Sequence, residues 1–207
     1  MTPELICKEL NMNLEAVWNI YPYGSRVYGT ADEKSDHDFI IVFKNSLLES
    51  GGFKDNAVSN GDKTIQGTAY SRGGFIDAIN NYMMPALESI SLPDNLITKK
   101  KFNFKINKFD EKEMVKSIIT QSSNSWHIAD LGWQREHRTS EGPSRTTRKA
   151  IWHSIRMLMF GLQLKENQKV IRFDESNELL STILEDQNFK PSCYLDIRDG
   201  LFEQLRK

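Results

Sequence analysis

The sequence predicts an α/β (α+β) fold: a small mixed and twisted sheet flanked by helices, followed by a helical C-terminal part. Up to residue 109, short apolar runs alternate with turn residues and short helical patterns. From Asp110 onward, the apolar residues recur at helical spacing. We therefore expect two domains, residues 1–109 and residues 110–207, which a chain of 207 residues is long enough to form.

Three strands should form the centre of the first domain. One is expected over residues 17–23, and the continuous apolar run at residues 39–43 is typical of a buried central strand. A third is expected over residues 63–70. Helices are expected over residues 3–14, 75–83 and 86–90, and residues 44–61, rich in Gly, Asn, Ser and Lys, are expected to be an exposed connection.

A locally basic segment closes the first domain. Between residues 99 and 108, Phe102, Phe104 and Ile106 alternate with polar residues, and this period of two predicts an edge strand or an extended arm. Lysines stand at positions 99, 100, 101, 105 and 108. Because lysines protect exposed sheet edges from aggregation, we favour a solvated edge over a functional surface here.

The second domain should contain four helices. The patterns predict a long helix over residues 110–133, which Ser122 and Ser123 could break, and a second over residues 144–164. Shorter helices are expected at 174–187 and 192–206, and a polar loop at 134–143. Trp126 and Trp152 are interpreted as core residues, whereas Trp133 could serve either packing or base stacking.

Composition narrows the class of protein. Hydrophobic residues make up 39% of the chain and charged residues 27%, as in soluble globular proteins. The formal net charge of −1 provides no global attraction to nucleic acid or membrane, so any polyanion site must be local. No apolar run approaches the ~20 residues of a membrane span, and the N-terminus does not resemble a signal peptide. Cys7 and Cys193 are expected to be reduced thiols, and the protein cytoplasmic.

The most informative stretch combines a glycine-serine turn with two aspartates. Gly24 and Ser25 supply backbone N–H groups and a hydroxyl, which suit an anionic phosphate. Asp36 and Asp38 are two residues apart at the start of an apolar run, so on a strand both carboxylates lie on the same side. Such a pair favours a divalent cation such as Mg²⁺. Together these features indicate metal-assisted phosphoryl or nucleotidyl transfer; a solvated turn without chemistry is the alternative.

These residues carry a family resemblance. The series Gly24-Ser25-Arg26, Gly29 and Ser35-Asp36-His37-Asp38 resembles the signature of the DNA polymerase β-like nucleotidyltransferase superfamily. The resemblance implies that residues 1–109 are the catalytic domain, that Gly24, Ser25 and Arg26 contact the phosphates of a nucleoside triphosphate (NTP), and that Asp36 and Asp38 bind Mg²⁺ or Mn²⁺. His37, between the two aspartates, should point the other way and pack.

A second stretch lies on the helix expected at 144–164. Arg145, Lys149, His153 and Arg156 form a basic stripe beside the apolar stripe of Ile151, Ile155, Leu158 and Leu162. Spacing alone leaves open whether this stripe meets a triphosphate or the acidic residues of a neighbouring helix. Lys149 to Leu158, with Tyr70-Ser71 and Leu87-Glu88, resembles a nucleotidyltransferase branch associated with RNA ligases and RNA repair in bacteria and large phages. That resemblance implies that Lys149, His153 and Arg156 contact the triphosphate or the substrate, in a cleft between the domains.

One position departs from the superfamily pattern. A third carboxylate is expected on the strand that precedes Tyr70-Ser71, and counting back places Gln66 there. An amide cannot accept a proton at neutral pH and is a poor metal ligand beside carboxylates. Asp62, which a bulge could bring nearer, and Glu88 are the candidate replacements.

The resemblance leads to three functional hypotheses. The first is an Mg²⁺-dependent enzyme that moves an NMP from an NTP to a hydroxyl, most plausibly at an RNA or tRNA end, and releases pyrophosphate. The second keeps the chemistry but makes a protein or small molecule the acceptor, which the near-neutral net charge favours. The third, supported by Gln66, is a degenerate module that binds a nucleotide without transferring it.

Overall fold

A computed structural model describes residues 1–44 and 55–207 of the chain. These residues form two compact units, Met1–Lys108 and Phe109–Lys207. We call them the sheet unit and the helical unit and describe each by itself.

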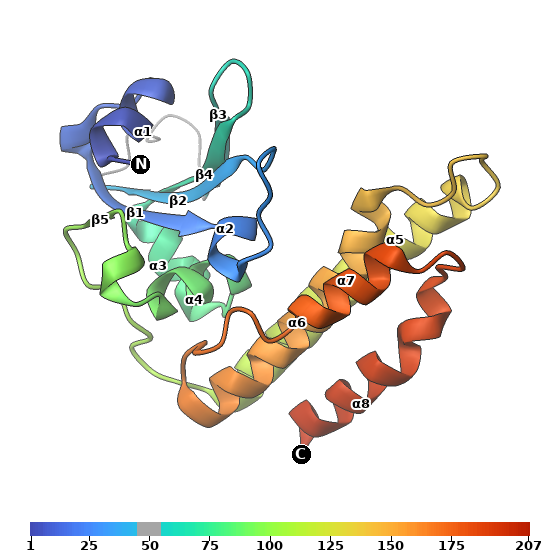
Figure 1. Cartoon of the computed structure of the whole chain (residues 1–207). Helices are drawn as coiled ribbons and strands as arrows, with labels where there is room; N and C mark the ends of the chain where they lie inside the picture. Colours follow the sequence, from blue (N-terminus) through green and yellow to red (C-terminus); the bar gives the residue numbers. More distant parts are fainter. Residues whose placement is uncertain (45–54) are drawn as a thin grey trace. The chain divides into compact units, whose positions relative to one another are not determined.

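The sheet unit contains a five-stranded mixed sheet with the strand order β3-β4-β2-β1-β5 (Figure 1). The strands are β1 (Val17–Tyr23), β2 (His37–Phe43), β3 (Asp55–Ser59), β4 (Ile65–Ser71) and β5 (Lys99–Lys100). The central neighbours β2 and β4 run parallel, and the other neighbouring pairs run antiparallel. The predicted fold class, a small mixed α/β sheet followed by helices, is confirmed.

Helices cover both faces of this sheet (Figure 1). The helices are α1 (Pro3–Glu9), α2 (Ser25–Tyr28), α3 (Arg72–Asn80) and α4 (Met84–Ser91), with short 3₁₀ turns at Leu14–Ala16 and Asp94–Leu96. On one face, Ile6 of α1 packs in a buried cluster with Phe39 and Ile41 of β2. On the other, the ring of Phe75 in α3 lies 5.8 Å from that of Tyr21 and 5.6 Å from that of Tyr70. A strand between two covered faces needs apolar residues on both sides, which explains the unbroken run in β2.

The helical unit is built on two long helices, α5 (Glu111–Glu136) and α6 (Arg145–Asn167), which pack along each other. The remaining elements are α7 (Asn177–Glu185), a 3₁₀ turn at Pro191–Tyr194 and α8 (Leu195–Arg206). The predicted apolar stripe of α6 is in the core, because Ile151, Ile155 and Leu158 are fully buried. Trp126 and Trp152 are also buried, as expected of core residues.

Two expectations for the helices differ from the structure. The first helix ends at Glu9 rather than at residue 14, because Asn11 adopts a left-handed conformation (φ 53°) that an α-helix cannot contain. The long helix α5 is not broken at Ser122-Ser123. The Ser122 hydroxyl is buried and lies 2.8 Å from that of Ser154 on α6, so it is satisfied without opening the helix.

The predicted connection over residues 44–61 contains a strand. Residues 45–54 lie outside the described residues, but β3 forms a hairpin with β4 whose register runs from Asp55 opposite Tyr70 to Ser59 opposite Gln66. Side chains of Asn60 and Asp62 hold the hairpin turn by accepting hydrogen bonds from backbone N–H groups. Because this segment is rich in residues typical of turns, its sequence did not indicate the edge strand β3, which is stabilised by pairing with β4.

The basic segment that follows forms only two residues of strand, Lys99–Lys100, at the edge next to β1. Beyond these two residues, the buried side chain of Asn19 forms the hydrogen bonds to the segment in place of a neighbouring strand. Its Oδ1 accepts hydrogen bonds from the backbone N–H groups of Lys101 (3.3 Å) and Phe102 (3.0 Å), and its Nδ2 donates to the Phe102 carbonyl at 2.8 Å. Asn19 thus holds Lys101 and Phe102 beside β1 without a continuous ladder.

Candidate active site

The two aspartates stand on one side of the central strand. Asp36 immediately precedes β2 and Asp38 is its second residue, so their side chains emerge from the same face. In the strand register, Asp38 lies opposite Tyr23 of β1 on one side and Gln66 of β4 on the other. Cross-strand partners share a face, so Asp38 and Gln66 are side by side on the face covered by α3 and α4.

Gln66 also contacts the other aspartate. Its side-chain Nε2 donates a hydrogen bond to Oδ2 of Asp36. The amide therefore bridges from β4 to the residue that precedes β2, and it neutralises no charge in doing so. The structure brings Asp36, Asp38 and Gln66 together, with an amide at the position where the superfamily pattern has an acid.

The register between β2 and β4 fixes this arrangement. Pairing runs without a bulge from His37 opposite Ile65 to Phe43 opposite Ser71. Gly67, next to Gln66, allows the close approach, because a Cβ there would collide with the backbone carbonyl of Phe39. Gly67 is a site-shaping residue that the sequence patterns did not identify; an isolated glycine within an expected strand was the available signal.

Gly24 brings the preceding loop against Asp38. Its φ of 73° and ψ of −152° belong to a region that essentially only glycine occupies. A Cβ at this position would collide with the carboxylate of Asp38, lying 3.1 Å from Cγ and 3.2 Å from Cβ of that residue. The chain then enters α2, so the expected glycine-serine turn is a single turn of helix that begins at Ser25.

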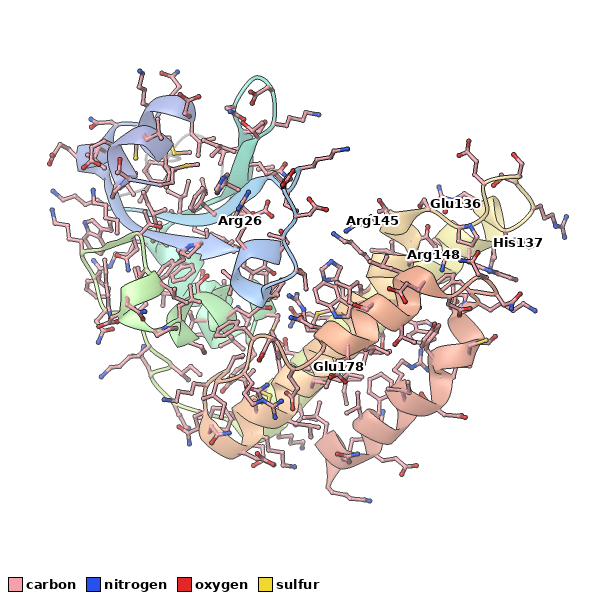
Figure 2. All side chains as sticks on the ribbon, in the orientation of Figure 1. Arg26, Glu136, His137, Arg145, Arg148 and Glu178 are labelled. Carbon is pink, nitrogen blue, oxygen red and sulfur yellow. The ribbon has the colours of Figure 1, made fainter. Side chains whose placement is uncertain are left out.

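Arg26 on α2 holds the segment that carries Asp36. Its Nε donates to the backbone carbonyl of Asp36 at 3.1 Å, and its Nη2 donates to that of Ser35 at 2.7 Å. The guanidinium is exposed and lies beside the loop that leads into β2 (Figure 2). In this arrangement Arg26 acts as a positioning residue for Asp36.

His37 lies on the opposite face from its two aspartate neighbours. Its ring is stacked on that of Phe39, with 6.4 Å between the centroids and 6° between the planes. Burial lowers the pKa of His37, and the positive charge of Arg26 lowers it further. A neutral, stacked imidazole agrees with the expected packing role.

The two candidate replacements for the missing acid have other partners. Asp62 is exposed in the β3–β4 turn, where its Oδ1 accepts from the backbone N–H of Thr64 at 3.1 Å and from its hydroxyl at 2.8 Å. These hydrogen bonds lower the pKa of Asp62. Glu88 on α4 is buried and its Oε2 accepts a hydrogen bond from the hydroxyl of Tyr28 on α2, at 2.5 Å. Gln66 therefore remains the β4 residue at the acid pair.

The basic stripe on α6 is not uniform. Arg145 is exposed, Lys149 and His153 are half-buried, and Arg156 is buried. The Arg156 guanidinium lies over the rings of Trp152 (4.9 Å) and Phe160 (5.4 Å). Burial, reinforced by the charges of Arg156 and Lys149, lowers the pKa of His153 to about 3. His153 is therefore neutral at pH 7 and adds no positive charge to the stripe.

Further residues that sequence reasoning did not single out fix the start of α6 (Figure 2). Glu136, near the end of α5, accepts from the backbone N–H of Ser144 at 2.7 Å and from the hydroxyl of Thr147 at 2.8 Å, and these bonds lower its pKa. Arg148 donates from Nη1 to the carbonyls of Ile183 (2.9 Å) and Asp186 (2.7 Å). Both side chains maintain the helical unit rather than present charge to a ligand.

The helical unit also contains a pocket of about 460 Å³ between the end of α5 and the 187–193 segment. Trp133 and His137 line it, and their rings are stacked with 4.1 Å between centroids. The indole Nε1 of Trp133 donates to the carbonyl of Phe189 at 3.2 Å. Trp133 is thus tied into the fold at the edge of this pocket.

Across residues 1–44 and 55–207, no group of three or more His, Cys, Asp or Glu side chains is placed to hold a metal ion. Within the same part of the chain, no helix combines the length and apolar character that crossing a bilayer requires.

The nucleotidyltransferase domain family matches residues 4–119, more than half of the chain. No curated protein sequence gives a significant match. Among solved structures, the chain is similar to a nucleotidyltransferase-like protein from Exiguobacterium sibiricum 255-15, at 10% identity and a TM-score of 0.33, over 92% of this chain and 68% of that one. The domain match carries the assignment: the chain belongs to the nucleotidyltransferase domain family.

Proposed function

We propose that the protein transfers an NMP from an NTP to a hydroxyl at an RNA end and releases pyrophosphate, with Mg²⁺ or Mn²⁺ as cofactor. The observation that carries the proposal is the placement of Asp36 and Asp38 on one face of β2, with the backbone of Gly24 against the Asp38 carboxylate. This arrangement combines a pair of hard oxygen ligands with a loop suited to phosphate. A cytoplasmic role in RNA repair is part of the same proposal.

The two carboxylates fit one divalent cation. Mg²⁺ is commonly held by one or two carboxylates, with phosphate oxygens and water completing its shell. Asp36 and Asp38 would hold it, and when bound it would neutralise charge on the phosphates. Gln66 offers an amide in place of a third carboxylate and donates to Asp36, so these residues suit one cation better than two.

The phosphates would be held by residues of the loop and by cations. Gly24, Ser25 and Arg26 would contact the triphosphate; Arg26 has a further guanidinium nitrogen beyond the two that hold the backbone. Lys149, His153 and Arg156 are proposed contacts from α6. Lys149 and Arg156 would offset charge on the leaving pyrophosphate, whereas neutral His153 would act through a hydrogen bond.

Gln66 also determines how the acceptor loses its proton. An amide cannot act as a general base, so the hydroxyl proton would pass to solvent rather than to residue 66. Because a positioned base typically contributes 10²–10⁴-fold, we expect slow transfer. Transfer to a protein or small molecule would use the same residues.

A second candidate function is nucleotide binding without transfer. The hydrogen bond from Gln66 to Asp36 favours it, because that bond occupies a carboxylate that a catalytic metal would need. Such a module would bind an NTP and pass the signal to a partner.

The deciding experiment is a transfer assay with each labelled NTP, Mg²⁺ or Mn²⁺, and a pool of small RNAs. Labelled RNA is expected with the native protein and not with Asp38→Asn. Asp62→Asn is the matched control, since Asp62 lies in the β3–β4 turn, and it should transfer normally. Label on protein would change the acceptor. NTP binding without any label would establish the binding module instead.

A further inference from the structure

A series of aromatic rings leads from the core of the sheet unit to its surface. Phe75 on α3 is fully buried, and its ring lies 5.0 Å from that of Phe104. Phe104 lies 4.7 Å from Phe102, which is 36% exposed. Phe102 in turn is stacked on the half-buried Trp18, with 5.0 Å between centroids and 15° between planes. The outer pair therefore forms a parallel, partly exposed platform that is anchored in the core.

The backbone beneath this platform is held in place. Asn19 is fully buried, and three hydrogen bonds connect its amide to the backbone of Lys101 and Phe102. A fourth joins its Nδ2 to the hydroxyl of Tyr21 at 2.6 Å. An edge that only needed lysines for solubility would not require a buried polar side chain to fix its register. Preorganisation of this kind reduces the cost of binding a ligand.

One cation lies over the platform, and two more lie close to it in the sequence. The guanidinium of Arg72 lies 5.2 Å from the Trp18 ring centre and 5.5 Å from that of Phe102. Lys101 and Lys105, which precede and follow Phe102 in the sequence, are exposed, and no acidic residue occurs between residues 99 and 108. By contrast, Lys99 and Lys100 are engaged with the Leu14 carbonyl and with Asp94.

We propose that Trp18, Arg72, Lys101, Phe102 and Lys105, the aromatic–basic face, bind single-stranded RNA. Unpaired bases stack on aromatic rings and on guanidinium planes, and lysines contact the phosphates. A duplex presents phosphates but keeps its bases stacked inside, so it cannot use the rings. The small number of cations fits a short footprint on a chain whose net charge is −1.

This face lies at the opposite end of β1 from the acid pair. Tyr23 at one end is the register partner of Asp38, and Trp18 stands five residues earlier, about 17 Å along the strand. The inference rests on the proposed function, because it names where an RNA acceptor would be held while its end lies near Asp36 and Asp38. Binding at this face would fix the position of the RNA without contributing to the transfer step.

The test is fluorescence anisotropy of a short labelled single-stranded RNA with the full chain, without NTP or metal, over a range of salt concentrations. Lys101→Gln with Lys105→Gln should lower the slope of log affinity against log salt by about 1.4, since each single-strand phosphate contact contributes about 0.7. Phe102→Leu keeps an apolar side chain but removes the ring, and should weaken binding by about fivefold or more. Phe102→Trp should retain it.

Lys112→Gln with Lys116→Gln, on exposed positions of α5, is the charge-matched control and should leave the slope unchanged. Thermal unfolding of each variant identifies any loss of folding. Equal binding of duplex and single strand, or identical slopes for the two lysine pairs, would overturn the proposal. Asp38→Asn should bind RNA normally. If the native protein binds RNA at this face but transfers no NMP, only the proposed function is refuted. If it transfers an NMP but does not bind RNA at this face, only the present inference is refuted.

Discussion

The acid pair of the sheet unit and the basic stripe of the helical unit reach their arrangements in different ways. Asp36 and Asp38 share a face because a strand alternates its side chains, and the register then adds Gln66. On α6, the same kind of periodicity lines up Arg145, Lys149, His153 and Arg156, but the neighbours of each residue change its character. The imidazole of His153 is neutral, and the guanidinium of Arg156 lies over aromatic rings.

The difference shows what a periodic pattern can and cannot determine. In both regions, spacing places the residues on one side of their strand or helix. It does not determine the protonation state or the partners, since these depend on residues brought from elsewhere in the chain. The following predictions test how far each region depends on such neighbours.

Replacing Gln66 by Glu should have the largest effect. Glu has nearly the same shape and would place a third carboxylate beside Asp38, so transfer should rise by about a hundredfold or more, the contribution of a positioned base. Rates with each NTP measure this, and Gln66→Ala is the control that removes the amide without adding acid. An unchanged rate in Gln66→Glu would mean that the lack of a carboxylate at residue 66 does not limit the rate of transfer.

Gln66→Glu should also change thermal stability, which can be measured without a transfer assay. Three adjacent carboxylates repel one another, so Gln66→Glu should unfold at a lower temperature than the native protein in the absence of divalent cation. Mg²⁺ or Mn²⁺ should restore the loss by binding the folded state. Calorimetry with and without metal measures both, and a melting temperature that does not respond to metal would count against a cation at the acid pair.

Gly24→Ala should lower the free energy of unfolding by about 2–3 kcal/mol, since residue 24 would be strained and its Cβ would displace Asp38. Gly142 also has a positive φ, 66°, but a Cβ there meets no atom within 4 Å. Gly142→Ala should therefore cost only about 1 kcal/mol. Denaturant unfolding of both variants separates the cost of a positive φ, which both share, from the cost of the Cβ collision with Asp38, which only Gly24→Ala has. Equal losses in the free energy of unfolding would contradict close packing of residue 24 against Asp38.

On α6, Lys149→Gln should weaken NTP binding by about fivefold at pH 7, whereas His153→Gln should leave the electrostatic part of binding unchanged. The reason is that the His153 imidazole is neutral at that pH. Titration of a fluorescent NTP measures both affinities, with the exposed Lys169→Gln as the matched control. If His153→Gln weakened binding more strongly at low salt than at high salt, its imidazole would have to carry charge.

The smallest effect concerns the pH dependence of stability. His153 has a pKa of about 3 in the fold, below its ordinary 6.5, so the unfolded chain takes up a proton first as the pH falls. The free energy of unfolding should therefore decrease below pH 6.5, by at most about 1.4 kcal/mol per pH unit, and be unaffected above it. His153→Gln should flatten this dependence between pH 7 and pH 5, and identical profiles would show that the fold does not lower the pKa of His153.

Much of the fold follows from local pattern. The continuous apolar run at residues 39–43 indicated a buried central strand, and β2 is buried on both faces. The stripe of Ile151, Ile155 and Leu158 indicated a core-facing helix, and α6 is one. The misplaced elements were short or irregular. β3 and the 99–108 segment depend on β4 and on Asn19 for their hydrogen bonds, and no local signal reveals such partners.

The candidate site divides in the same way. The sequence by itself determined that Asp36 and Asp38 share a side and that Gly24 lies in a glycine-serine turn, because both follow from the pattern of a few consecutive residues. Only the tertiary structure decided that Gln66 donates to Asp36 across thirty positions of the chain, that Asp62 is used in a turn, and that His153 is neutral. Strand register and burial are set by packing over the whole unit, so residues distant in sequence acquire their chemistry only when the fold brings them together.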